Sequence, residues 1–106
     1  MTSAAFTKMV LSFDCTMNHS HFDRVAFKVV GKRIFATLLE EKSLANIKLS
    51  PSEQLIFCSM SKAISPVPNK WGEQGWTTFE IKNVENNIIL EALNSAYQDI
   101  VKKKNA

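Results

Sequence analysis

The residues whose types could bind a metal ion are concentrated in one short segment near the amino terminus. This segment contains Asp14, Cys15, His19, His21 and Asp23. In an extended strand, the spacing of His19 and His21 would place both imidazoles on one side. The segment matches no zinc-ligand spacing, however, and the sequence offers no second pair of ligands elsewhere. We therefore predict no metal and no cofactor, and we expect His21 to anchor a loop through a hydrogen bond.

Cys58 is the candidate nucleophile for covalent catalysis in this sequence. Cys58 lies in the apolar stretch between Leu55 and Met60, where a buried and unreactive thiol is usual. Cys15 and Cys58 form no C-x-x-C pair, which favours free thiols over a disulfide. With only three glycines the chain has no phosphate-cradling loop, because the W-G-E-Q-G-W segment leads into a predicted strand. The sequence therefore predicts that the chain is not an enzyme.

Basic and aromatic residues are predicted to share one face of a sheet. Strand pairing would place Phe35 between Lys28 and Lys48, and the adjacent hairpin tip carries two further cations. Such a surface can hold phosphates while an aromatic ring stacks on a base. The candidate nucleic-acid-binding residues are Lys28, Lys32, Arg33, Phe35, Lys48, Lys70 and Trp71.

The same surface has other interpretations. A strand face that carries Phe35 and Trp76 also suits a homodimer or another protein partner. Trp71 and Trp76 could close a small-molecule pocket against neighbouring prolines, although a small apolar cluster beneath the loop is the more common arrangement and is the one we expect. DNA and a protein partner therefore remain alternative occupants of this face.

A β-hairpin is the most clearly marked structural element. Residues 25–30 alternate in the period of a strand, and Gly31-Lys32 suits a two-residue turn. This register pairs apolar residues with one another across the hairpin and continues into a third strand over residues 44–49. The expected pairs are Val25 with Leu38, Phe27 with Ala36, Val29 with Ile34, Leu38 with Ala45, Ala36 with Ile47, and Ile34 with Leu49.

The other elements follow from periodicity and capping signals. An apolar stripe predicts a first helix after Thr2 or Ser3, and the aperiodic residues 14–21 are expected to form a loop. Ser50-Pro51-Ser52-Glu53 is a capping-box sequence that opens a second helix reaching about Met60. Short strands are expected at 63–67 and 76–82, and a last helix begins near Val84. The order helix, three strands, helix, two strands, helix predicts an α+β fold of two layers, with helices packed on one face of an antiparallel sheet.

Length and charge narrow the classes of protein that fit. At 106 residues the chain is expected to form a single domain, residues 1–106. We find neither an apolar run of membrane-spanning length nor the pattern of a signal peptide. We therefore expect a cytoplasmic protein without a membrane partner. The formal net charge is +3, but Lys102, Lys103 and Lys104 account for three of the 13 basic residues. The remaining ten equal the ten acidic residues, so a polyanion partner would depend on a local patch.

Four segments together resemble the MmcQ/YjbR family of small bacterial proteins. They are HFDRVAFKVVGKRIFATL, KLSPSEQ, PVPNKWGEQGWTTFEI and ALNSAYQDI, and they extend over nearly the whole chain. The resemblance implies an α-β-β-β-α-β-β-α domain similar to type III secretion chaperones. It also implies DNA binding through hairpins and offers no catalytic motif. One departure is Phe13-Asp14-Cys15, where the family has Leu-Pro or Phe-Pro before the loop.

Overall fold

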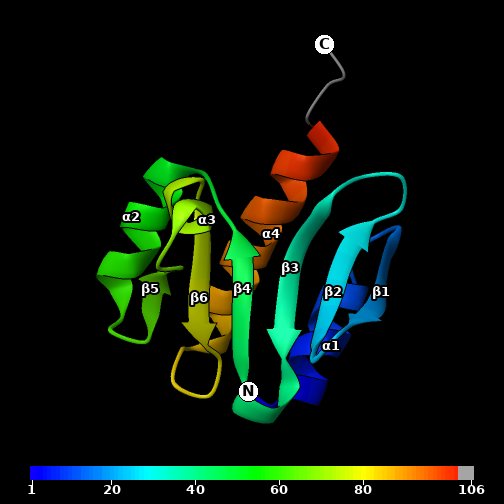
Figure 1. Cartoon of the computed structure of the whole chain (residues 1–106), viewed down its shortest axis with the longest axis horizontal. Coiled ribbons are helices and arrows are strands. Elements are labelled where there is room, and N and C mark those ends of the chain that lie inside the picture. Colours follow the sequence, from blue (N-terminus) through cyan, green and yellow to red (C-terminus); the bar gives the residue numbers. More distant parts are fainter. Residues whose placement is uncertain (103–106) are drawn as a thin grey trace.

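The computed structural model describes residues 1–102; Lys103 and Lys104 of the terminal basic run lie outside the described residues. The chain is organised around a six-stranded antiparallel sheet with the strand order β1-β2-β3-β4-β6-β5 (Figure 1). The strands are β1 (Thr16–His21), β2 (Arg24–Val29), β3 (Ile34–Leu39), β4 (Leu44–Lys48), β5 (Ile64–Pro66) and β6 (Trp76–Glu80).

Three long helices cover one face of this sheet. They are α1 (Ser3–Leu11), α2 (Pro51–Met60) and α4 (Asn86–Lys102). In Figure 1 the sheet lies in front of α1 and α4, so the face toward the viewer carries no helix across its centre. A 3-10 turn, η1 (Glu40–Lys42), joins β3 to β4, and the short helix α3 (Lys70–Glu73) immediately precedes β6. The predicted two-layer α+β fold is confirmed.

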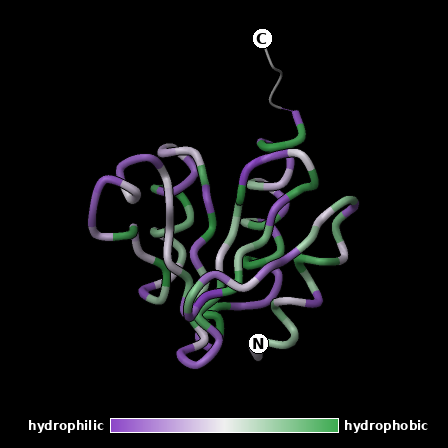
Figure 2. Tube along the Cα trace, turned by 45° about the vertical axis from the view of Figure 1, so that its right-hand side comes forward, coloured by the Kyte–Doolittle hydropathy of each residue, from purple (hydrophilic) through white to green (hydrophobic). Residues whose placement is uncertain are grey.

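The core forms between the helices and the covered face of the sheet. Phe6 of α1 packs edge-on against Phe27 of β2 with ring centres 5.9 Å apart, and Phe57 of α2 packs in the same way against Phe79 of β6 at 6.3 Å. Helix α4 alternates hydrophobic and hydrophilic stretches along its length (Figure 2), as expected for a helix that buries one stripe. Its buried residues are Ile89, Ala92, Leu93, Ala96 and Ile100.

Local signals in the sequence account for the second helix and the far edge of the sheet. The Ser50 hydroxyl accepts from the backbone N–H of Glu53, whose carboxylate in turn accepts from the backbone N–H of Ser50, so the predicted capping box is present. Pro51 occupies the first turn, as expected. β5 is an edge strand that ends at Pro66, which has no N–H to donate to a neighbouring strand.

The segment that was predicted to be a loop is the edge strand β1. It pairs with β2 from Thr16–Val29 to His21–Arg24. Five of its six side chains are exposed, so it shows no alternation of apolar and polar residues. Its stability comes from backbone pairing to β2 and from a tight turn in which Phe22 adopts a left-handed conformation with φ +59°. Neither feature leaves a hydrophobic pattern in the sequence.

The β2–β3 hairpin differs from the expected register near its tip. The pairs Val25–Leu38 and Phe27–Ala36 are confirmed, but Lys28, not Val29, faces Ile34. The shift between Phe27 and Lys28 inserts one extra residue into β3, which is a β-bulge. The turn also lies one residue earlier than predicted, because the Lys32 N–H donates to the carbonyl of Val29 and Gly31 takes a φ of +80°.

The third strand pairs as predicted over most of its length. Leu38 faces Ala45 and Ala36 faces Ile47. Beyond that point β3 and β4 separate (Figure 1), and Ile34 is exposed on the opposite side of the sheet from the position predicted for it. In residues 1–102 no helix is long and apolar enough to cross a membrane.

Candidate nucleic-acid interface

The uncovered face of the sheet is hollowed into a concavity of about 1150 Å³. One rim is the turn between β2 and β3, and the other is α3 with the segment that precedes it. The floor includes Thr37 of β3 and Asn46 of β4, and α4 contributes Asp99 and Ile100 where β3 and β4 separate. Within residues 1–102 the lining is His21, Arg24, Gly31, Lys32, Arg33, Ile34, Thr37, Asn46, Lys48, Val67, Trp71, Gln74, Trp76, Asp99 and Ile100.

Positive charge predominates in this lining. Among the described residues, its cationic side chains are Arg24, Lys32, Arg33 and Lys48, and its one carboxylate side chain is that of Asp99. Arg24 begins β2 and has a buried Nη1 nitrogen that finds no hydrogen-bond partner among the described residues. A buried donor without a partner costs about 1–3 kcal/mol.

The predicted cations lie on this face or at its border. Lys32, Arg33 and Lys48 all line the concavity, as the sequence predicted. Lys28 is half-buried and pairs with Met17 and Ile34, beside the lined area. Lys70 is exposed on α3, next to Trp71.

Phe35 does not lie on this face, so its predicted role as a stacking ring is wrong. The extra residue in β3 turns Phe35 toward the helices, where it is completely buried. Its ring lies 6.2 Å from that of Tyr97 on α4, in an edge-on arrangement. In its place, Ile34 is exposed between the cationic residues. A Phe35 in the core stabilises the fold and has no access to a ligand.

Trp71 and Trp76 supply the aromatic surface that Phe35 does not. Both line the concavity, and Trp76 pairs directly with Lys48 across β4 and β6. Trp71 is 59% exposed, so the expected apolar cluster beneath the loop does not bury it. The prediction that Trp76 faces the open side of the sheet is confirmed, because it lines this concavity while Phe79 is buried on the other face.

The loop that carries the tryptophans is held by backbone contacts. The side chain of Asn69 caps α3 by accepting from the N–H of Trp71 at 2.9 Å. Gly72 and Gly75 pass so close to neighbouring backbone that an added Cβ would lie 1.7 Å from the carbonyl oxygen of Val67 and 1.8 Å from that of Leu49. Only glycine fits at these two positions.

A buried glutamine that is absent from the predicted site residues fixes the same loop to α2. Gln54 Nε2 donates to the carbonyl oxygens of Gly72 at 2.9 Å and Trp76 at 3.0 Å. It also lies 3.1 Å from the hydroxyl of Thr77, which donates to the Gly75 carbonyl. Gln54 could have been recognised in the sequence as a polar residue on the inward side of α2, three positions before Phe57, where an apolar residue is usual.

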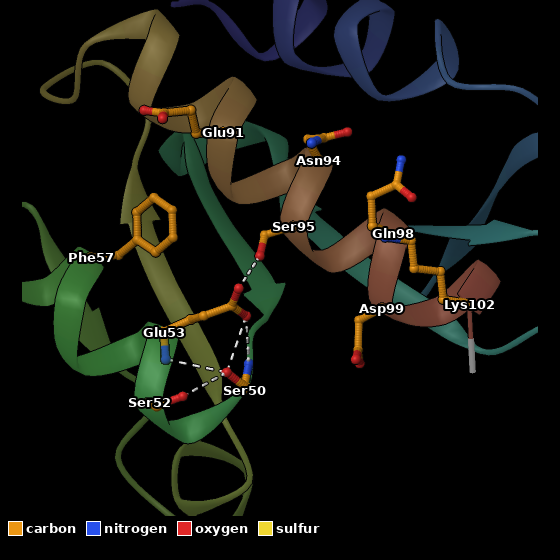
Figure 3. Close-up of a pocket in the computed structure, with 10 residues that line it drawn as sticks. All are labelled: Ser50, Ser52, Glu53, Phe57, Glu91, Asn94, Ser95, Gln98, Asp99 and Lys102. Atoms are coloured by element: carbon orange, nitrogen blue, oxygen red, sulfur yellow. Dashed lines mark hydrogen bonds between the residues drawn. The ribbon is translucent and has the colours of Figure 1, made fainter. Parts of the chain in front are cut away.

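A second hollow, of about 700 Å³, lies between the start of α2 and α4 (Figure 3). Glu53, Glu91 and Asp99 line it, but the two oxygens of Glu53 already have partners. One accepts from Ser50, and the other accepts a short hydrogen bond from the Ser95 hydroxyl of α4. The bond from Ser95 is the main cause that lowers the pKa of Glu53. This hollow therefore contains a structural link between two helices.

The remaining candidate groups are dispersed. No group of three or more His, Cys, Asp or Glu side chains in residues 1–102 is arranged to hold a metal ion. His21 packs edge-on against Phe22 with ring centres 4.8 Å apart, in place of the hydrogen bond that we expected, and it lines the concavity. Cys58 is half-buried against the core, and burial raises the pKa of its thiol, which lowers its reactivity.

Comparison with known proteins gives one informative match. No protein-family model matches this sequence, and no curated protein does. Among solved structures, the chain is similar to the Deinococcus radiodurans protein DR2400, a DUF419 domain, with a TM-score of 0.77 and 20% identity. The alignment covers 99% of this chain and 81% of that protein. The chain shares its fold with a DUF419 domain. Because DUF419 is grouped with MmcQ/YjbR-like proteins, the resemblance read in the sequence is supported at the level of the fold.

Proposed function

We propose that this chain is a non-enzymatic DNA-binding domain that contacts phosphates through the concave open face of its sheet. The observation that carries the proposal is the set of four cations and one carboxylate that, among residues 1–102, line the concavity on the face of the sheet turned away from α1. Phosphate contacts position a protein on DNA without reading sequence, so the expected binding is weak and largely independent of sequence.

The charge distribution supports a local patch. The chain excluding its terminal lysine run is formally neutral, so attraction to a polyanion must come from where the charges are gathered. Arg33 and Lys32 are exposed on one rim, and Lys48 lies on the floor with its ammonium group donating to the carbonyl of Leu49 at 3.2 Å.

A protein partner or a second copy of the chain is the alternative occupant. The exposed rings and Ile34 favour it, because apolar surface on an otherwise polar face is typical of interfaces. The two functions differ in their response to salt. Association through apolar surface is almost insensitive to ionic strength, whereas phosphate binding releases counterions and weakens steeply.

The test is a fluorescence-anisotropy titration with a short labelled DNA, as a duplex and as a single strand, at 50 and 200 mM salt. If all four cations contact phosphates, affinity should fall roughly 50- to 150-fold between these salts. The variant Arg33→Glu/Lys48→Glu should lose binding. Lys8→Glu/Lys62→Glu makes the same change in net charge at exposed positions outside the concavity and should bind as the unaltered chain does.

Equal loss of binding in both double variants would show that total charge, not this face, is responsible. Absence of binding to either DNA at 50 mM salt would overturn the proposal. Sedimentation of the unaltered chain at both salts would then test the alternative, which predicts a dimer that persists at high salt.

A further inference from the structure

The shape of the concavity restricts the form of DNA that can enter it. The turn between β2 and β3 forms one rim, and α3 forms the other. Trp71 belongs to the α3 rim, and Trp76 lines the concavity from β6. In a duplex the bases are stacked inside the helix, so that only phosphates and groove edges reach a protein surface. A duplex could touch the cations on the rims, but it could not place a base against the faces of the tryptophans.

The tryptophans have the chemistry of a stacking surface. An exposed indole is costly in water, yet 59% of Trp71 is exposed at a position fixed by the Asn69 cap. Trp76 is held through its carbonyl by Gln54 and lies in the same concavity. Stacking of a base on an aromatic side chain contributes about 1–3 kcal/mol and is open to every base.

Cations lie where the phosphates of a stacked strand would pass. Lys48 is the direct cross-strand neighbour of Trp76, and both side chains line the concavity. Arg33 and Arg24 line the other side of the same hollow, and Arg24 keeps one buried nitrogen without a partner among the described residues. A base on the indole with its phosphate on a cation is the arrangement by which proteins bind single strands without reading sequence.

Resting on the proposed function, we infer that the DNA this face binds is a single strand. Its bases stack on Trp71 and Trp76, and its phosphates contact Arg24, Arg33 and Lys48. The duplex is then the weaker ligand, because it offers phosphates without accessible bases.

The experiment compares a labelled 12-nucleotide oligothymidylate with a duplex of the same length by anisotropy, at one salt concentration, and follows tryptophan fluorescence in parallel. The single strand should bind more tightly and quench the fluorescence. Trp71→Ala should weaken single-strand binding about 5- to 150-fold, which corresponds to the stacking energy of one base. Trp71→Phe should retain most of the binding.

Leu55→Ala is the matched control, because Leu55 is 73% exposed on α2 and lies outside the concavity. It should bind as the unaltered chain does. Because Trp71 is largely exposed, its replacement should leave the fold intact, which a thermal melt would verify. Tighter binding to the duplex, or an unchanged affinity in Trp71→Ala, would overturn the single-strand inference while DNA binding itself stood. Failure of both DNA forms to bind would overturn the proposed function as well.

Discussion

Lys48 and Trp76 illustrate how neighbouring side chains give the open face its character. They are Cα partners on β4 and β6, so strand register, and not proximity in the sequence, brings both residues to the same concavity. Arg24 reaches the same hollow from the start of β2. A mixed surface of this kind suits a ligand that carries both negative charge and flat apolar rings, as a nucleotide strand does.

Glu53 is a charged side chain that links two helices of the core layer. Its pKa lies below the ordinary value of 4.5, chiefly because Ser95 donates to the carboxylate. A group whose pKa is lowered in the folded chain contributes stability above its ordinary pKa, and that contribution is lost as the pH falls through the folded value. The link between α2 and α4 should therefore weaken in acid.

Ser95→Ala tests this link. Without the hydroxyl, the pKa of Glu53 should rise toward 4.5, and the free energy of unfolding at pH 7 should fall by about 1 kcal/mol, a modest loss because the carboxylate is partly exposed. The pKa is measured by NMR titration of the side-chain carboxyl carbon. Ser59→Ala is the control, because Ser59 donates only within α2, to the carbonyl of Ile56. An unchanged Glu53 pKa in Ser95→Ala would contradict the assignment.

Among the elements, the loop between β5 and β6 depends most on close backbone approach. Gly75 takes a φ of +110°, and its carbonyl accepts from the N–H of Leu49 at 3.0 Å. A side chain here would strain the backbone and meet the Leu49 carbonyl at the same time. Gly31 also has a positive φ, of +80°, but no atom lies within 4 Å of the position of its Cβ.

Alanine variants of the two glycines can be compared directly, because both have a positive φ and only Gly75 lies close to neighbouring backbone. Gly75→Ala should lower the free energy of unfolding by about 3 kcal/mol or more, as the sum of the left-handed backbone cost and a steric clash. Gly31→Ala should cost about 1 kcal/mol, the backbone term alone. Thermal melts should therefore differ by roughly 10 °C between the two variants. Equal melting temperatures would show that the contact with Leu49 is unimportant.

The sequence predicted the elements that have a strong internal pattern and missed those that depend on their neighbours. The capping box before α2 and the apolar stripe of α4 are local signals, and both were found. β1 has no apolar alternation because it is an exposed edge strand, so only its partner β2 reveals it. The β-bulge that buries Phe35 results from competition between hairpin register and packing against Tyr97, which no local pattern records.

The sequence predicted the types of residue in the candidate site, basic and aromatic, but not how they are arranged. Lys32, Arg33, Lys48 and Trp71 were selected and lie together in the concavity. Phe35 was selected wrongly, because alternation counted from the hairpin turn fails when one residue is added. Arg24 was not selected, because a cation at the start of a strand gives no indication of which cavity its side chain will line.

At the scale of the whole molecule, the fold separates two tasks. The helices and one face of the sheet form the core, and the other face is left without a helix across its centre. The similarity to a DUF419 domain extends over 99% of the chain, so the open face belongs to an architecture that another protein shares. The proposed function depends on the side chains that this chain places on that face.

The most direct test of the proposal is an NMR titration of the isotope-labelled chain with a short single-stranded DNA. The proposal predicts shifts in the indole N–H signals of Trp71 and Trp76 and in the backbone amides of residues 31–34 and 46–48. The amides around Lys8 on α1 and Leu55 on α2 should remain unchanged, since these residues lie outside the concavity. Shifts confined to the helical layer would contradict the claim that the open face of the sheet binds DNA, and no shifts with either this strand or a duplex of the same length would contradict DNA binding altogether.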